Sequence, residues 1–318
     1  VPIRVKVIVK GDSMTVDLSR MSPQVKGFFN SGAGVACAQV AFKCLTLPTD
    51  HPINDGNFRP LNVILPKGTV VSALHPAPMR VWMTYPMTLV DTIFKALSQA
   101  IPESVIAGHH ADLVIANVNG FHPRDGKLWI YLGGLIGGGW GAKHNEDGVN
   151  VTVCMNDGDT HNGPSEQVEN KFPLLVRYYR LREDSGGAGQ FRGGLGAEAE
   201  VVALSKVNYQ TRIDRVNHPP WGLQGGHSAM GNRVGMRKKD GTLTLYNSGK
   251  VNMRLDAGEA YVLHSGGGGG FGDPKKRDKA AVLRDLRLGY ISEETARKVY
   301  GLKVATSQGA RQKSRRAP

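Results

Sequence analysis

Five consecutive glycines, Gly266–Gly270, constrain this chain more than any other feature of its sequence. Glycine loses more backbone entropy on folding than other residues. An ordered run of glycines is therefore expected where a Cβ atom would prevent the required backbone angles or the close approach of another segment. Two structures meet that requirement: a nest of N–H groups that binds an anion, or a tight crossing of chains in an intersubunit or interdomain core. We favour the crossing, because the run lacks the Lys-Ser/Thr pair of a nucleotide-binding loop, and Gly249-Lys250-Val251 also misses the hydroxyl.

Two further glycine-rich segments lie upstream. Gly133–Gly141 follows an apolar stretch, as a dinucleotide-binding loop does, but no helical pattern comes after it, which argues against a Rossmann site. The second, Asp184–Gly194, places Ser185 between an acid and a glycine but lacks the Gly-x-Ser-x-Gly pattern of a nucleophile elbow. We interpret it as a glycine-dense hairpin in which Arg192 pairs with Asp184.

Short segments of alternating or apolar residues predict a β-rich core. Residues 3–9 and 14–18 read as a hairpin with one buried face. Further strands are predicted at residues 61–65, 113–118, 128–132, 149–154, 174–181, 199–204 and 243–246. Because helices long enough to connect parallel strands are missing between residues 112 and 261, we expect antiparallel sheets there.

Helical patterns flank this β-rich region. We expect helices from residue 31 or 34 to residue 44 and over residues 88–101. The chain closes with two helices, one over residues 279–288 before Gly289 and one that is capped by Ser292 and ends at Gly301. The predicted fold is therefore mixed α+β, β-rich with antiparallel sheets, Gly-rich loops and two C-terminal helices.

The charge distribution suggests how the chain is organised. Residues 1–302 are expected to form one domain and residues 303–318 a basic, flexible tail. The net charge is +13, and part of it lies in that tail. No aromatic residue is interleaved there for base stacking, so we interpret the tail as solvated and expect no nucleic-acid binding. An absent N-terminal half or an acidic partner chain would balance the remaining charge.

Several features predict a cytoplasmic protein. No segment approaches the about 18 apolar residues of a membrane-spanning helix, and no signal-peptide pattern is present, so we expect no membrane contact. Three cysteines without a CxxC pair fit a reducing compartment. The first residue, Val1, already lies close to a predicted strand, so we expect further sequence to precede it.

The segment Asp157–Glu166 is a candidate catalytic loop, because it packs three carboxylates and a histidine between apolar strands. His161 would act as a general base or a ligand, with Asp159 or Glu166 orienting it. Glu166 and Glu169 would share a face if a helical turn begins at Ser165. The alternative is a turn whose aspartates make local hydrogen bonds.

A second candidate, His109-His110-Ala111-Asp112, offers two imidazoles and a carboxylate for a metal ion. Adjacent histidines on a strand point to opposite faces, so both can bind one ion only where the backbone turns. The alternative is that these are loop residues with local hydrogen bonds. We therefore state His109, His110 and Asp112 as a metal-binding hypothesis.

A set of short motifs follows a fixed order along the chain. They are Asn30-Ser31-Gly32-Ala33-Gly34, Arg59-Pro60, Pro66-Lys67-Gly68-Thr69, Pro76-Ala77-Pro78, Pro164 with Glu166 and Glu169, Asp184-Ser185-Gly186-Gly187, Arg192-Gly193-Gly194, Gly222-Leu223-Gln224-Gly225-Gly226, Gly266–Pro274 with Arg277-Asp278, and Tyr300-Gly301. Each fragment is weak alone. In this order, and over this length, the set resembles the C-terminal part of the hydantoinase B/oxoprolinase family.

The resemblance implies a subunit of an ATP-dependent enzyme. The family includes subunits of N-methylhydantoinases, 5-oxoprolinases and the acetone and acetophenone carboxylases. It implies a hetero-oligomer in which a hydantoinase A-type partner holds ATP with Mg, in agreement with the missing phosphate loop. We expect hydrolysis of a small cyclic amide through a phosphorylated intermediate. A ketone carboxylase subunit and a non-catalytic scaffold are the alternatives.

The resemblance carries over few site residues. A divalent Zn, Mn or Fe ion would be held mostly by the family's N-terminal half, so no metal ligand is transferred by motif. Glu169, Asp184, Arg192 and Gly267-Gly268-Gly269 lie in the shared motifs and are predicted to line the substrate site or a subunit interface. The sequence departs from the family's usual pattern at residues 159–164 and at His109-His110, differences that would report the substrate class.

Overall fold

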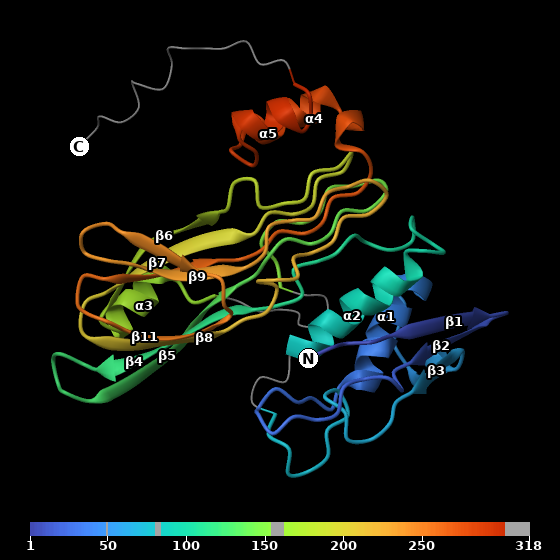
Figure 1. The fold of residues 1–318 in the computed structure, drawn as a ribbon, viewed down its shortest axis with the longest axis horizontal. Helices are drawn as coiled ribbons and strands as arrows, with labels where there is room; N and C mark the ends of the chain where they lie inside the picture. Colours follow the sequence, from blue (N-terminus) through green and yellow to red (C-terminus); the bar gives the residue numbers. More distant parts are fainter. Residues whose placement is uncertain (49, 80–83, 154–161, 303–318) are drawn as a thin grey trace.

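The computed structural model describes residues 1–48, 50–79, 84–153 and 162–302. A body built from two β-sheets occupies one side, and a smaller unit of strands and helices lies beside it (Figure 1). The basic segment 303–318 lies outside the described residues. Among the described helices, none combines the length and apolar character needed to cross a membrane.

The smaller unit is made of the first part of the chain. Its sheet pairs β1 (Lys6–Lys10) with β2 (Ser13–Asp17) as the expected hairpin and β2 with β3 (Leu61–Ile64) in parallel. Two helices, α1 (Gly34–Thr46) and α2 (Thr84–Leu97), complete it. Alternate residues of β2 and the apolar sides of both helices share one core. A short 3-10 helix, η1 (Asp55–Phe58), precedes β3.

The body is an antiparallel sandwich. One sheet has the order β10-β9-β12-β7-β6 and the other β11-β8-β4-β5, with every neighbouring pair antiparallel. The strands are β4 (Val114–Phe121), β5 (Leu128–Ile136), β6 (Leu174–Leu181), β7 (Ala197–Ala203), β8 (Val207–Arg212), β9 (Arg233–Arg237), β10 (Leu243–Tyr246), β11 (Lys250–Leu255) and β12 (Ala260–His264). Tyr209 of β8 stacks on Tyr261 of β12 at 5.0 Å between ring centroids, which joins the two sheets through one core.

The predicted mixed α+β fold with antiparallel sheets is confirmed, and the errors are local. The helix predicted at residues 88–101 begins earlier, at Thr84. Pro86 fits in the first helical turn, because a backbone N–H in that turn would have no intrahelical acceptor and its absence costs nothing. Of the strand predicted at residues 149–154, the described part makes only an isolated bridge between Thr152 and Gly138. Strands β8, β9, β11 and β12 were not predicted.

The glycine run Gly266–Gly270 is the central segment of a bundle of extended chains. Backbone N–H groups from residue 267 to residue 271 all donate to carbonyl oxygens of other segments, those of Met230, Gly194, Gly108, His227 and Phe191. A Cβ atom at Gly268 would lie 1.9 Å from the carbonyl oxygen of Trp140. The interpretation as a crossing of chains is therefore confirmed, and these N–H groups are not free to form an anion nest.

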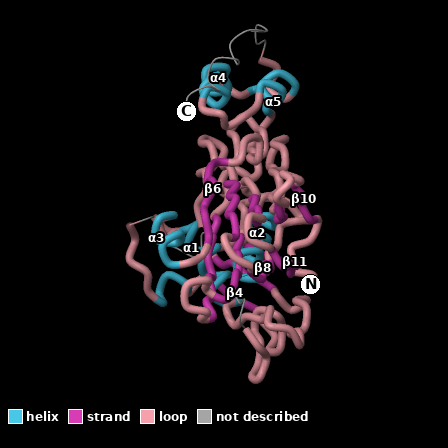
Figure 2. Tube along the Cα trace, turned by 90° about the vertical axis from the view of Figure 1, so that its left-hand side faces the viewer, coloured by secondary structure: helices cyan, strands magenta, loops and turns pink. Residues whose placement is uncertain are grey.

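The two expected C-terminal helices, α4 (Lys279–Arg287) and α5 (Glu293–Lys298), follow a short 3-10 helix, η2 (Pro274–Lys276). Figure 2 shows α4 and α5 at one end of the molecule, beyond the loops that carry the glycines. Asp278 and Ser292 accept backbone N–H groups as their N-caps. This end forms its own small apolar cluster around Val282 and Ile291.

Buried ion pairs attach this end to the bundle. The predicted pairing of Arg192 with Asp184 is wrong: Nε of Arg192 lies 3.4 Å from Oδ2 of Asp285. Asp184 has a positive φ of 59°, and its carboxylate instead accepts the backbone N–H of Ser292. Arg277 joins the same network, donating to Asp285 and to Asp147. The predicted local contact within a hairpin is thus replaced by a contact between residues about 90 positions apart in the sequence. Asp285 attracts Arg192 because its carboxylate is buried beside two guanidinium groups.

Candidate functional site

The candidate catalytic loop leads into a short helix, α3 (Ser165–Lys171). Asp159 and His161 lie outside the described residues. Glu166 lies in the first turn of α3 and is exposed. A helical turn does begin at Ser165, which was the condition for Glu166 and Glu169 to share a face. Glu169 accepts the backbone N–H of Val176 at 2.8 Å. This bond ties α3 to β6, which positions the helix over the sandwich.

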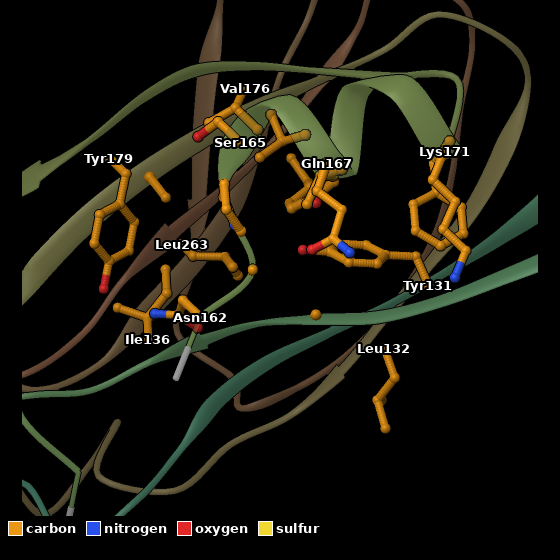
Figure 3. A pocket seen from close by; sticks show the side chains of 18 of the residues that line it. Tyr131, Leu132, Ile136, Asn162, Ser165, Gln167, Lys171, Val176, Tyr179 and Leu263 are labelled. Carbon is orange, nitrogen blue, oxygen red and sulfur yellow. The ribbon is translucent and has the colours of Figure 1, made fainter. Parts of the chain in front are cut away.

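Beneath α3 the structure contains a cavity of about 580 Å³, shown in Figure 3. It lies between α3, β5 and the inner face of the larger sheet. Gln167 reaches from α3 toward Tyr131, while Tyr179 lies at the opposite end. Its lining includes Tyr131, Gly133, Asn162, Gln167, Lys171, Phe172, Val176, Tyr179, Tyr261 and Leu263. The described end of the predicted loop, residues 162–165, thus lines a cavity of the size that small molecules occupy.

One glycine makes room for an aromatic wall. A Cβ atom at Gly133 would lie 1.8 Å from the ring of Tyr131, so only glycine lets that ring turn across the strand. The Tyr131 ring in turn packs on Phe172, with 5.0 Å between centroids. Phe172 follows directly on α3, so strand and helix hold each other through aromatic contact.

The lining is almost electrically neutral. Burial raises the pKa of Tyr179, and a hydrogen bond from Asn162 lowers it less. Burial likewise raises the pKa of Tyr261 well above its usual value. Both phenols therefore stay protonated and neutral at physiological pH. Lys171 is the one charged side chain among the described lining residues, and its ammonium lies 5.6 Å from the centroid of the Phe172 ring.

These groups suit a small uncharged molecule with an amide or ketone oxygen. The carboxamides of Asn162 and Gln167 can each donate and accept hydrogen bonds, and the phenols can donate. Val176, Phe172 and Leu263 offer apolar surface for methylene groups. The described lining carries no carboxylate, so the arrangement supports binding and orientation, and it provides no general base of its own.

The predicted metal ligands diverge. Nδ1 of His109 lies 3.2 Å from Asp91, a residue of α2. His110 instead lies 2.7 Å from the side-chain oxygen of Asn232, and Asp112 accepts from the same Asn232 amide and from the backbone of Asp214. No group of three or more His, Cys, Asp or Glu that could hold a metal ion occurs among the described residues. The hypothesis finds no support there, because His109 contacts Asp91 while His110 and Asp112 both bond the side chain of Asn232.

Burial decides the ionisation of this cluster. The pKa of His110 falls to about 3, mainly because burial penalises the charged imidazolium. The pKa of Asp112 rises to about 7, first through burial and then through the nearby Asp214 carboxylate. Burial also acts to raise the pKa of Asp91, but Arg215 and His109 outweigh this effect and hold the pKa well below its usual value. The cluster thus combines a neutral histidine with a permanently ionised carboxylate.

The remaining predicted residues belong to the glycine bundle. Gly267, Gly268 and Gly269 contact the backbones of Ser185, Trp140 and Trp221, and they do not line the cavity under α3. Sequence reasoning missed the cavity residues Tyr131 and Tyr179. Residues 128–132 were predicted as a strand without an assigned inner face, and nothing in the sequence showed that the ring of Tyr131 borders an open space.

Comparison with known proteins assigns the family. The family model of hydantoinase B/oxoprolinase matches residues 1–274. A putative D-/L-hydantoinase component from a Pseudomonas species is 29% identical over 316 residues, 96% of this chain and 52% of that protein. The beta chain of the caprolactamase of Pseudomonas jessenii is 33% identical over 315 residues, 95% of this chain and 53% of that protein. This chain belongs to the hydantoinase B/oxoprolinase family, as its motifs predicted.

Solved structures agree. The crystal structure of the ATP-dependent caprolactamase from Pseudomonas jessenii superposes with a TM-score of 0.84 at 29% identity, covering 96% of this chain and 54% of that one. A more distant relative, the acetone carboxylase alpha subunit of Xanthobacter autotrophicus, is 25% identical over 319 residues, 87% of this chain and 40% of that protein. The chain spans about half the length of its hydantoinase and caprolactamase relatives.

Proposed function

We propose that this chain is part of a subunit of an ATP-dependent cyclic amide hydrolase, and that the cavity under α3 receives the amide. The observation that carries the proposal is the match to the caprolactamase structure over 96% of this chain. The neutral, partly aromatic lining supports it, because a lactam or hydantoin is uncharged and presents an N–H and a carbonyl oxygen to the carboxamides of Asn162 and Gln167.

The family resemblance supports a proposed division of labour between this chain and a partner. ATP with Mg is bound by a hydantoinase A-type partner in a cytoplasmic hetero-oligomer, and the γ-phosphoryl group passes to the amide oxygen. Water then adds to the activated carbon and the C–N bond breaks, which leaves an acyl phosphate, and a second water hydrolyses this acyl phosphate to the carboxylic acid and phosphate. Asn232 and the backbone of Asp214 engage His110 and Asp112, and of these three residues His109 alone has a ring nitrogen, Nε2, that is buried without a hydrogen-bond partner, so the three do not supply a ligand set for a divalent ion.

The proposal is tested on the protein as it co-purifies with its partner chains. ADP release is measured with caprolactam, a hydantoin and 5-oxoproline, and stimulation by one of these supports the hydrolase. The matched pair Gln167→Ala and Asn170→Ala then locates the site, because both change α3 but only Gln167 lines the cavity. A higher KM in the first variant and an unchanged KM in the second are expected.

A ketone carboxylase subunit is the second candidate, favoured by the likeness to the acetone carboxylase alpha subunit. Bicarbonate-dependent consumption of a ketone, without ADP release on any cyclic amide, would replace the first proposal. A non-catalytic scaffold is the third. Turnover unchanged in His161→Ala, Glu166→Ala and Gln167→Ala variants of the intact complex would assign the chain that role.

A further inference from the structure

A second, larger cavity of about 910 Å³ lies between α2, the first residues of the chain and the sheet that contains β8 and β11. The N-terminus lies next to α2 in Figure 1, in agreement with this position. Its charged lining residues are Asp91, Lys95, Arg212, Asp214, Arg215 and Lys250, with His218 beside them. It shares no lining residue with the cavity under α3.

The cations of this cavity outnumber its carboxylates. Four positive side chains face two carboxylates, His218 aside, which leaves an excess of two positive charges. Lys95 and Lys250 make no ion pair with any described residue, although both lie on the cavity wall. Arg212 donates to the carbonyl oxygens of Thr211 and Val251, which leaves its charge without a carboxylate.

The back wall is held rigid. Asp91 is buried, and its Oδ2 accepts from Arg215 at 2.5 Å and from the indole N–H of Trp221 at 3.1 Å. Arg215 also donates to the backbone carbonyl of His110. The ammonium of Lys95 lies 5.9 Å from the centroid of the Trp221 ring. Because the wall is ordered in advance, a ligand would not lose binding energy in arranging it.

From this charge balance we propose that the cavity between α2 and β8 binds a phosphomonoester group of a small molecule. A phosphate monoester carries about −1.5 to −2 charges at neutral pH, close to the excess on the wall, on three acceptor oxygens of one group, whereas a dicarboxylate such as succinate divides the same charge between two separate groups. Lysine and arginine donate charge-assisted hydrogen bonds to phosphate oxygens. The proposal goes beyond the hydrolase function and does not rest on it, because the amide is assigned to the other cavity.

Equilibrium titration of the purified complex at constant ionic strength tests it, with inorganic phosphate, AMP and succinate as the probes. Phosphate and AMP are expected to bind more tightly than succinate. Tighter binding of AMP than of phosphate identifies a nucleoside ester as the source. Equal binding shows that the phosphoryl group alone is recognised.

Matched variants locate the binding. Lys95→Met and Lys250→Met are each expected to weaken AMP binding by about tenfold, the effect of losing one charge-assisted hydrogen bond. Lys298→Met removes an exposed ammonium at the far end, in α5, and should leave the affinity unchanged. No detectable binding of phosphate or AMP, or equal affinities in Lys95→Met, Lys250→Met and Lys298→Met, overturns the proposal. Circular dichroism of each variant confirms that it is folded.

Discussion

The ring of Tyr131 occupies the space in which a side chain at residue 133 would begin, 1.8 Å from the ideal Cβ position of Gly133. Residues 131 and 133 are two positions apart on β5, so side chains at these two positions point to the same face of the sheet. The glycine therefore decides where the tyrosine lies, and the tyrosine together with Phe172 forms the aromatic wall of the cavity.

Replacing Gly133 with alanine should reshape that cavity. The methyl group displaces the Tyr131 ring, so we expect KM for the cyclic amide to rise severalfold in the intact complex and stability to fall by about 1–3 kcal/mol. Gly27→Ala is the control, because nothing lies within 4 Å of its Cβ position. Unchanged KM in Gly133→Ala would show that the ring does not shape the substrate site.

Gly268→Ala should be far more damaging. Its Cβ atom would lie 1.9 Å from the carbonyl oxygen of Trp140, and the obstacle is backbone, which cannot rotate away. We expect a loss of at least about 4 kcal/mol or failure to fold, measured by urea unfolding. Gly32→Ala, with open space around its Cβ position, should change stability by less than about 1 kcal/mol. Similar stabilities for the two variants would contradict the packing of the bundle.

Asp91→Asn should destabilise the contact between α2 and the sandwich. Asparagine removes the charge that Arg215 faces and replaces one of two acceptor oxygens, either Oδ1, which bonds His109, or Oδ2, which accepts from Arg215 and Trp221. The buried guanidinium then lacks its counter-ion. Loss of one partner of a buried pair costs about 3–5 kcal/mol. Denaturant unfolding measures it, with Asp240→Asn in an exposed turn as the control. A cost below that of the control would mean that the pair contributes no net stability.

Asp112 predicts a pH dependence. Its folded-state pKa of about 7 lies above the usual value of 3.8, so the folded protein binds the proton more tightly than the unfolded chain. The unfolding free energy should therefore fall as pH rises from about 4 to 7, by roughly 1–4 kcal/mol from this residue. Asp112→Asn removes the effect, so its stability relative to the native protein should rise over the same interval.

Unfolding midpoints at pH 5, 6, 7 and 8 measure that difference. Asp12→Asn, at an exposed turn between β1 and β2, serves as the control. Parallel pH profiles for the native protein and Asp112→Asn would show that the carboxyl is ionised at all these pH values.

The predictions from the sequence pattern succeeded for features that depend on residues close together in the sequence. The cap at Ser292, the helix that precedes Gly289 and the strand over residues 174–181 all depend on neighbouring residues, and all are present. Strands β9 and β12 were missed, since Val262 and Gly235 are buried in the middle of a sheet and show no clear alternation. The candidate residues Asp159 and His161 stay predictions, because they lie outside the described residues.

The sequence by itself determined the family, the mixed and mainly antiparallel character of the fold, and the need for close backbone packing at Gly266–Gly270, because motif order, strand periodicity and missing Cβ atoms are properties of the chain alone. Only the tertiary structure decided that Arg192 pairs with Asp285, that His109 contacts Asp91, and that Tyr131 borders a cavity. Those relationships depend on which segments, far apart in the sequence, are buried against one another. Packing decides which groups meet there, and these groups must then neutralise each other's charges and fill the available space.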